Sequence, residues 1–278
     1  RMFSFQRLGG LVSYGWKLLA SSLLDTVYLK LSQLVVGLKY TSTDLAYYNK
    51  GDQLCVLVVE NINYSIDSVL LPVLSAEQDN RDHVREMTRR AIKTSSYIMM
   101  PLMMGMAVGA EPLIRLLLTE KWLPCVPFLQ IVCAVYAFYP LHTANLNAIK
   151  AMGHSEIFLR LEIIKELIGI GLLFAAMNIG VYAVAVSQLI SGLIALVINA
   201  WPNRRLLGYK LSGQLRDMLP ALLLACLMGV CIYPLGLLGL SDWLTLLIQV
   251  PLGIAIYVGS SVIFRVDSFS FMLDVLRR

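Results

Sequence analysis

The chain has 278 residues, of which 58% are hydrophobic and 15% are charged, and its formal net charge is +5. A soluble domain carries about 25% charged residues, and a single water-soluble core cannot bury so large an apolar excess. The composition therefore excludes an ordinary soluble domain and predicts an all-α integral membrane protein.

Eight apolar stretches reach or exceed the roughly 20 residues that a helix needs to cross a bilayer. In chain order they are Leu8–Leu38, Leu54–Leu74, Thr94–Leu118, Leu123–Ile149, Ile157–Met177, Val181–Ala200, Met218–Leu240 and Trp243–Phe264. The first two contain several polar residues and are only moderately apolar. About eight transmembrane helices are therefore predicted.

Lys and Arg residues are distributed unevenly among the segments between these predicted spans. When alternate segments are taken together, 17 lie on one side of the membrane and 4 on the other, while Lys17 and Lys30 lie inside the first span. Cytoplasmic loops carry the excess of Lys and Arg. Both termini are therefore predicted to be cytoplasmic.

Two polar stripes run along the first two predicted spans. The stripe on the first consists of Lys17, Ser21, Asp25, Tyr28 and Ser32, and that on the second of Asn49, Gln53, Glu60, Asn63 and Asp67. Steps of three, four or seven residues keep each stripe on one face of a helix. Charged groups within a bilayer usually face a bundle interior or a water-filled cavity. We expect the stripes to line an aqueous cavity; the alternative is that they pair with each other and stabilise the helix packing.

The segment Ser75–Ser96 contains nine of the 41 charged residues. Within it, Arg81, Arg85, Arg89 and Lys93 recur every four residues and would form one basic stripe on a helix. One interpretation is a cytoplasmic extension of a helix that is attracted to anionic lipid headgroups. The other is a cytoplasmic basic rim at the mouth of a cavity, which gathers an anionic lipid substrate.

The remaining polar residues give weaker signals. Glu162, Lys165 and Glu166 lie within two turns near a predicted cytoplasmic end, where pairing among themselves or snorkelling explains them. His142 is expected to be a satisfied packing residue, and the five cysteines, which lack CxxC spacing, are expected to pack as small hydrophobic side chains. The sequence has no GxxxxGK[ST], G-x-S-x-G or HExxH motif, so no enzyme, cofactor or metal site is expected.

Four longer segments carry a family resemblance. They are PLMMGMAVGAEPLIRLLLTEKWLPCVPFLQ (Pro101–Gln130), DLAYYNKGDQL (Asp44–Leu54), HTANLNAIKAMG (His142–Gly153) and NAWPNRRLLGY (Asn199–Tyr209). All four resemble the polysaccharide flippase branch of the multidrug/oligosaccharidyl-lipid/polysaccharide exporter superfamily. The resemblance implies a MATE-like transporter of two lobes, of which residues 1–207 would be the second six-helix lobe and residues 208–278 two additional helices; the first lobe would be missing.

The same resemblance implies export of undecaprenyl-pyrophosphate-linked oligosaccharide across the bacterial inner membrane by alternating access, for lipopolysaccharide or exopolysaccharide synthesis. The implied partners are that lipid-linked oligosaccharide, the lipid bilayer, the missing lobe and polysaccharide polymerase machinery, with no nucleic acid. Two alternatives are a cation-coupled drug exporter of the same superfamily and a non-transporting scaffold in envelope polysaccharide assembly. A third is a membrane enzyme of polysaccharide assembly, which would need a large periplasmic loop, and none is predicted.

The substrate implied by the family resemblance, taken together with the polar stripes, suggests which residues contact it. A pyrophosphate in an apolar path needs basic partners, and the candidates are Lys17, Lys30 and Lys50. The candidate contacts for the sugar chain are Tyr28, Asn49, Glu60, Asn63, Tyr64 and Asp67. Asp25 is assigned either to tuning Lys17 or to ion coupling.

Overall fold

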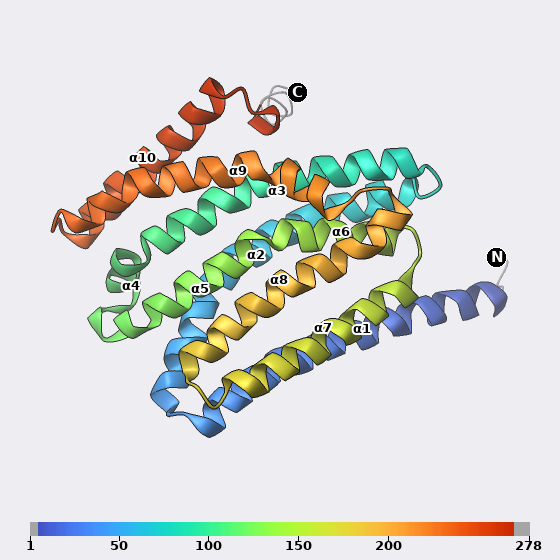
Figure 1. The fold of residues 1–278 in the computed structure, drawn as a ribbon, viewed down its shortest axis with the longest axis horizontal. Helices are drawn as coiled ribbons and strands as arrows, with labels where there is room; N and C mark the ends of the chain where they lie inside the picture. Colours follow the sequence, from blue (N-terminus) through green and yellow to red (C-terminus); the bar gives the residue numbers. More distant parts are fainter. Residues whose placement is uncertain (1–4, 270–278) are drawn as a thin grey trace. The chain divides into compact units, whose positions relative to one another are not determined.

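The computed structural model describes residues 5–269, with side chains from residue 9 onwards, and every regular element in that part of the chain is a helix (Figure 1). The elements, with the short 3₁₀ helices labelled η, are α1 (Phe5–Lys39), α2 (Ser42–Ala76), α3 (Arg81–Val108), α4 (Ala110–Leu118), η1 (Glu120–Cys125), α5 (Val126–Ala137), α6 (Tyr139–Ala151), α7 (Ser155–Ala176), α8 (Val181–Leu206), α9 (Leu211–Ile232), η2 (Tyr233–Leu237) and α10 (Asp242–Ile263). The predicted all-α class is confirmed. Four arginines in the charge count, Arg1, Arg7, Arg277 and Arg278, lie outside the described side chains.

Each of the eight predicted spans is helical along nearly all of its length. By length and composition, α1 from Gly9, α2, α8, α9 with η2, and α10 could each cross a membrane. Two pairs reach this length only together, with bends of 72° between α3 and α4 and 40° between α5 and α6, which brings the candidates from five to seven. The helix α7 is long enough, but it is not among these candidates because its first half contains four charged residues. The fold is that of an all-helical membrane protein.

The chain divides into two compact units. The first unit contains Arg1–Leu45, Asp67–Thr88 and His142–Lys210, and the second unit contains Ala46–Ile66, Arg89–Leu141 and Leu211–Arg278. Both α2 and α3 therefore contribute one part to each unit. The predicted boundary at residues 207/208 falls in the connection between α8 and α9, and the assignment of the two sides to a lobe and an added helix pair stays a prediction.

In the first unit, α7 packs along both α1 and α8 (Figure 1). The hydroxyl of Tyr40, just after α1, donates to the carbonyl of Met177 at 2.7 Å. Near the other end of α1, the Tyr14 hydroxyl donates at 3.0 Å to the carbonyl of Lys150 at the end of α6, shortly before α7 begins. Between these ends Gly169 of α7 leaves room for the ring of Tyr28, because a Cβ there would come within 2.8 Å of it. The helices α1 and α7 are thus held together along most of their length.

The second unit has a buried apolar core made by α2, α3, α4 and α5. Its fully buried members include Cys55, Met103, Ile114 and Leu129. The sulfur of Cys55 lies 3.4 Å from that of Met103, and the other core cysteines, Cys125 and Cys133, are also free and buried. These three pack as small hydrophobic side chains, as predicted. The prediction is wrong for Cys226 and Cys231 of α9, which are exposed. The helix α10 packs against α9 and α4.

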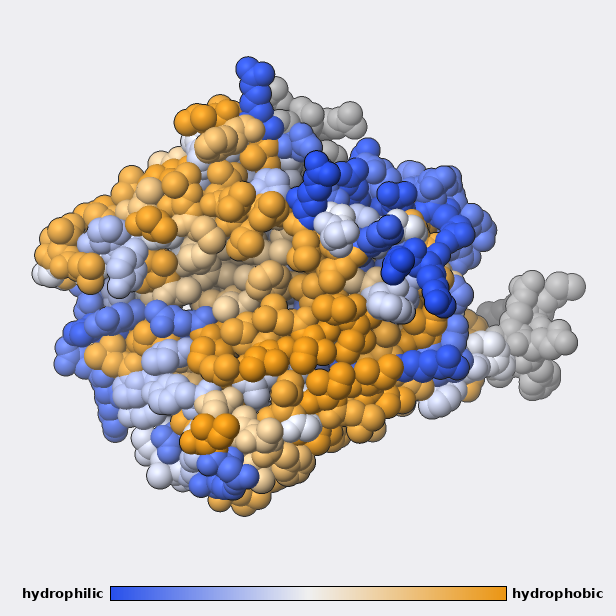
Figure 2. Space-filling model, viewed as in Figure 1, coloured by the Kyte–Doolittle hydropathy of each residue, from blue (hydrophilic) through white to orange (hydrophobic). Residues whose placement is uncertain are grey.

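Apolar side chains cover the outward faces of several helices. Ile190, Leu193 and Val197 are exposed along α8 at three- and four-residue steps, and Val230 of α9 is 72% exposed. Figure 2 shows apolar residues across the middle of α8, with hydrophilic residues gathered towards the ends of the helices. Such a distribution suits helices whose middle lies in hydrocarbon and whose ends lie in the polar interface.

Candidate functional site

The polar stripe of α1 meets α7 in the first unit. Asp25 is attracted electrostatically to Lys165 of α7, and Tyr28 fits against Gly169. The two serines of the stripe are 1% exposed, and each donates its hydroxyl to a carbonyl one turn earlier, Ser21 at 2.8 Å and Ser32 at 3.2 Å. At these positions the stripe is packed against helix rather than open to solvent on all sides.

Charged side chains of α7 complete this contact. Lys165 donates to Glu162 at 2.7 Å, with 13% and 6% of the two side chains exposed, which confirms the expected pairing. Glu166 is 8% exposed and is repelled by both Asp25 and Glu162. We call Asp25, Tyr28, Glu162, Lys165 and Glu166 the α1–α7 seam. It contains three carboxylates and one ammonium group.

Lys17 and Lys30 lie far apart on α1. Thirteen residues separate them along the helix, which corresponds to about 20 Å of rise and to directions about 140° apart. Lys17 is half-buried and interacts electrostatically with Glu156 of α7, whereas Lys30 is exposed and donates to Gln33 at 3.3 Å. These two lysines cannot converge on one pyrophosphate, so at most one of them contacts it at a given step.

Lys50 belongs to an aromatic cluster in the second unit that the sequence patterns did not identify. Its ammonium lies 5.9 Å from the centre of the Trp122 ring and donates to Gln53 at 3.0 Å. Tyr47 meets Trp122 edge to face at 5.9 Å and donates its hydroxyl to the carbonyl of Lys121 at 3.2 Å. A cation beside two partly exposed aromatic rings can hold a sugar ring by stacking and hydrogen bonding. The only sign of this cluster in the sequence was the presence of Tyr47–Tyr48 and Lys121–Trp122 in two of the quoted segments.

The rest of the α2 stripe does not share one environment. Glu60 is exposed and Tyr64 is 78% exposed. The side chain of Asn63 is buried and that of Asn49 half-buried, and in both the side-chain oxygen is buried without a hydrogen-bond partner in the described part of the chain. A buried amide oxygen without a partner is costly, and a ligand hydroxyl would satisfy it.

Asp67 lies in the part of α2 that belongs to the first unit, where Asn147 of α6 donates to its carboxylate at 2.5 Å. Two more amide contacts join α6 to α8 in the same unit. Asn203 donates to the side chain of Asn145 at 2.6 Å, and Asn199 and His142 are 3.0 Å apart. His142 is therefore a satisfied packing residue, as expected. The residues that join α6 to α8 come from two of the quoted segments, His142–Gly153 and Asn199–Tyr209. The sequence did not show that they pair.

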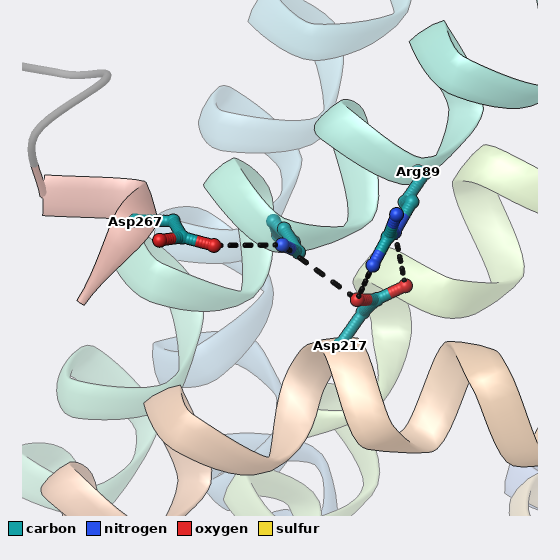
Figure 3. Close-up of polar contacts among 4 residues, drawn as sticks. Arg89, Asp217 and Asp267 are labelled. Atoms are coloured by element: carbon teal, nitrogen blue, oxygen red, sulfur yellow. Dashed lines mark hydrogen bonds and ion pairs between the residues drawn. The ribbon is translucent and has the colours of Figure 1, made fainter.

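Three of the four residues in the basic stripe of α3 bind other parts of the protein. Arg81 donates to the carbonyls of Arg205 and Leu206, at 2.7 and 2.6 Å, and so caps the end of α8 in the first unit. In the second unit Arg89 and Lys93 bind carboxylates after residue 210 (Figure 3). Arg85 is exposed. The stripe therefore fastens helices together, and its role as a rim that gathers substrate stays a prediction.

These groups can bind a ligand. The exposed or half-buried amides, aromatic rings and ammonium groups suit an anionic headgroup and sugars. Among residues 5–269, no group of three or more His, Cys, Asp or Glu side chains is placed to hold a metal ion.

Comparison with known proteins gives three findings. Residues 1–127 match a family described as "Polysaccharide biosynthesis protein". Teichuronic acid biosynthesis protein TuaB of Bacillus subtilis (strain 168) is 21% identical over 237 residues, which cover 85% of this chain and 49% of that protein. Lipopolysaccharide biosynthesis protein WzxC of Escherichia coli (strain K12) is 26% identical over 133 residues, which cover 48% of this chain and 27% of that protein.

The fold is similar to that of a solved membrane transporter. The lipid II flippase MurJ, in an inward closed conformation, superposes with a TM-score of 0.77 and 19% identity, over 95% of this chain and 56% of that one. The chain thus spans about half the length of MurJ and of TuaB. Together the comparisons confirm the family resemblance found in the sequence.

Proposed function

We propose, from the polysaccharide flippase family that the three comparisons support, that this chain forms part of a flippase for lipid-linked oligosaccharides. Its substrate would be an undecaprenyl-pyrophosphate-linked oligosaccharide, moved across the bacterial inner membrane for lipopolysaccharide or exopolysaccharide synthesis. The observation that carries the proposal is that one chain shows both a sequence similarity and a fold similarity that point to the same kind of protein. Its sequence is similar to two proteins named for cell-surface polysaccharides, and its fold is similar to a lipid flippase.

The proposal includes the organisation of the transporter. Residues 1–207 act as the second six-helix lobe and residues 208–278 as two further helices, with both termini in the cytoplasm. The coverage of 56% of MurJ supports a half-transporter that works with a matching first lobe. The lobes alternate between a cavity open to the cytoplasm and one open to the periplasm, while the polyprenyl tail stays in lipid. The chain works as a transporter and not as an enzyme.

Each unit has its own candidate contact with the substrate. Lys17, half-buried on α1, is the basic partner of the pyrophosphate at the cytoplasmic side. Lys50, with Tyr47 and Trp122, contacts the sugar chain at the periplasmic end of α2, and the buried amide oxygens of Asn49 and Asn63 bond to sugar hydroxyls. The support is the position of these groups and their hydrogen-bonding capacity.

The test joins this chain to the first lobe of a related polysaccharide flippase and asks whether the fusion restores surface polysaccharide in a flippase-deficient strain. Lys17→Ala and Lys50→Ala are expected to abolish or strongly reduce rescue, and Lys30→Ala to leave it nearly intact, all at unchanged membrane abundance. Rescue that survives both of the first two changes would contradict the site. No rescue from an abundant, inserted parent fusion would contradict the flippase.

One observation favours a second candidate, the cation-coupled drug exporter. The α1–α7 seam contains more carboxylates than cations, and coupling to a cation would use such a carboxylate. In that case Asp25→Asn would abolish drug resistance conferred by the fusion, whereas Lys17→Ala would not. A strain lacking its drug exporters distinguishes the two, because the flippase gives no resistance there.

A further inference from the structure

The chain after residue 210, which forms α9 and α10, contacts one face of α3. Arg89, Lys93 and Tyr97 are spaced by four residues, so their side chains lie above one another on that face. The guanidinium of Arg89 makes two hydrogen bonds to the carboxylate of Asp217 on α9, at 2.8 and 2.9 Å. Lys93 approaches the same carboxylate at 3.7 Å. All of these residues belong to the second unit.

The carboxylate of Asp217 has little access to water. Its side chain is 8% exposed, and Figure 3 shows it on α9 turned towards Arg89 of α3. A carboxylate so buried requires cations and donors in good geometry, and a two-bonded guanidinium supplies them. Lys93 also binds Asp267, just after α10, at 3.2 Å. The chain segments on both sides of α10 are therefore tied to the same turn of α3. We call Arg89, Lys93, Asp217 and Asp267 the α3 clamp.

Neutral, buried contacts continue the clamp along α3. The hydroxyl of Tyr97 donates to Ser261 at 2.7 Å, and the hydroxyl of Tyr257 donates to the carbonyl of Tyr97 at 2.9 Å. The two tyrosines are 5% and 4% exposed, with ring centres 4.9 Å apart. Farther along α3, Met104 packs directly on Gly229 of α9. A contact that opened in every transport cycle would have to break this ionic group and these buried bonds together.

We infer that the α3 clamp is permanent, so that α9 and α10 move with residues 46–66 and 89–141 as one body during transport. Asp217 is the positioning residue of this body, because it is the buried carboxylate on which Arg89 and Lys93 converge. Only the statement about movement during transport rests on the proposed function. The attachment of α9 and α10 to α3 can be tested without it.

The first experiment uses the chain of 278 residues in detergent and measures trypsin cleavage after Lys210, in the connection between α8 and α9. Asp217→Asn is expected to raise the rate of this cleavage about 10-fold, because it removes the charge of a carboxylate that is 8% exposed and accepts two hydrogen bonds from Arg89. The charge exchange Arg89→Asp with Asp217→Arg is expected to restore most of the protection at Lys210. Only the fragment cut after Lys210 is counted, because Asp217→Arg adds a trypsin site of its own. Asp82→Asn, an exposed carboxylate on α3, is the matched control. An unchanged rate in Asp217→Asn, or no recovery in the exchange, overturns the clamp.

The second experiment tests permanence during transport. Arg89→Cys and Asp217→Cys are combined in the fusion with the first lobe, with the exposed Cys226 and Cys231 changed to alanine. Inverted vesicles then report translocation of the host's radiolabelled undecaprenyl-diphosphate oligosaccharide. A short bifunctional methanethiosulfonate reagent is expected to restore translocation that the uncrosslinked pair has lost. Translocation that stops on crosslinking and returns with reductant overturns permanence. A parent fusion that never transports contradicts the proposed function instead, and the cleavage experiment still decides the attachment.

Discussion

The two units differ in the ratio of basic to acidic side chains between their helices. In the α3 clamp of the second unit, two basic side chains meet two carboxylates, and the most buried carboxylate has a two-bonded partner. In the α1–α7 seam of the first unit, three carboxylates share one ammonium group. The comparison suggests that balanced charge between helices fastens them, whereas an excess of one sign leaves a group available for a ligand or an ion.

The largest expected effect comes from unbalancing the clamp. Arg89→Ala removes the two-bonded partner of Asp217 and leaves Lys93 at 3.7 Å from the same carboxylate. Loss of one partner of a fully buried ion pair costs about 3–5 kcal/mol of unfolding free energy. Because 46% of the Arg89 side chain is exposed, the expected loss here is smaller, about 2–3 kcal/mol. Thermal unfolding in detergent measures the loss. Replacing both residues by leucine should cost less than Arg89→Ala alone, because no buried charge is then left unpaired; a larger cost would contradict the explanation.

The next effect concerns how closely each contact is packed. A Cβ on Gly169 in the seam, or on Gly229 in α9, would meet a neighbour at 2.8 Å. The neighbour of Gly169 is the stiff ring of Tyr28, but that of Gly229 is the flexible side chain of Met104. Gly169→Ala should therefore cost about 1–3 kcal/mol, as overpacking does, and Gly229→Ala clearly less.

Thermal unfolding of these two variants is compared with that of Gly171→Ala, where the added Cβ has open space around it. The control should match the parent or exceed it slightly, since alanine favours helix over glycine by about 1 kcal/mol. Equal losses at Gly169 and Gly229 would show that the ring of Tyr28 can move aside as easily as Met104.

A smaller effect is expected for the paired carboxylate of the seam. Glu162→Gln weakens a charge-assisted hydrogen bond to Lys165 that is 2.7 Å long and mostly buried. The expected loss of unfolding free energy is about 1–2 kcal/mol, within the range for hydrogen bonds to charged groups. The measurement is the same thermal unfolding, made at neutral pH. A gain in stability would mean that repulsion among the carboxylates outweighs this bond.

The smallest effect should have the opposite sign. Glu166→Gln removes a carboxylate that is repelled by Asp25 and Glu162 and keeps the shape of the side chain. Stability should rise by up to about 1 kcal/mol, because an excess of like charge is relieved. If Glu166→Gln destabilised the protein as much as Glu162→Gln, the seam would be as balanced as the clamp and the comparison would fail.

Much of the fold followed from local pattern. The eight apolar stretches became helices because the length and composition of a span are properties of one continuous segment. The four-residue spacing of Arg81, Arg85, Arg89 and Lys93 predicted a helix for the same reason. The bend of 72° between α3 and α4, within one predicted span, could not be found by averaging hydropathy.

The candidate site was less accessible to sequence reasoning. The polar stripes gave the right kinds of residue, but a helical period says only which side chains share a face. It could not indicate that Lys50 would meet Trp122, some seventy residues later, or that Asn147 would bind Asp67. Helical geometry alone gives the distance between Lys17 and Lys30 along α1. Which helix each lysine contacts, and therefore which role it can have, depends on the tertiary structure.

The sequence by itself determined that the chain is helical, apolar and strongly asymmetric in its basic residues, because composition and periodicity act within each segment. Only the tertiary structure decided what the basic stripe of α3 does. Arg81 caps α8 and Arg89 binds Asp217, 128 residues away in the sequence. A stripe of arginines is the same on a helix that faces water and on one that faces a carboxylate, and only the packing of distant helices distinguishes them.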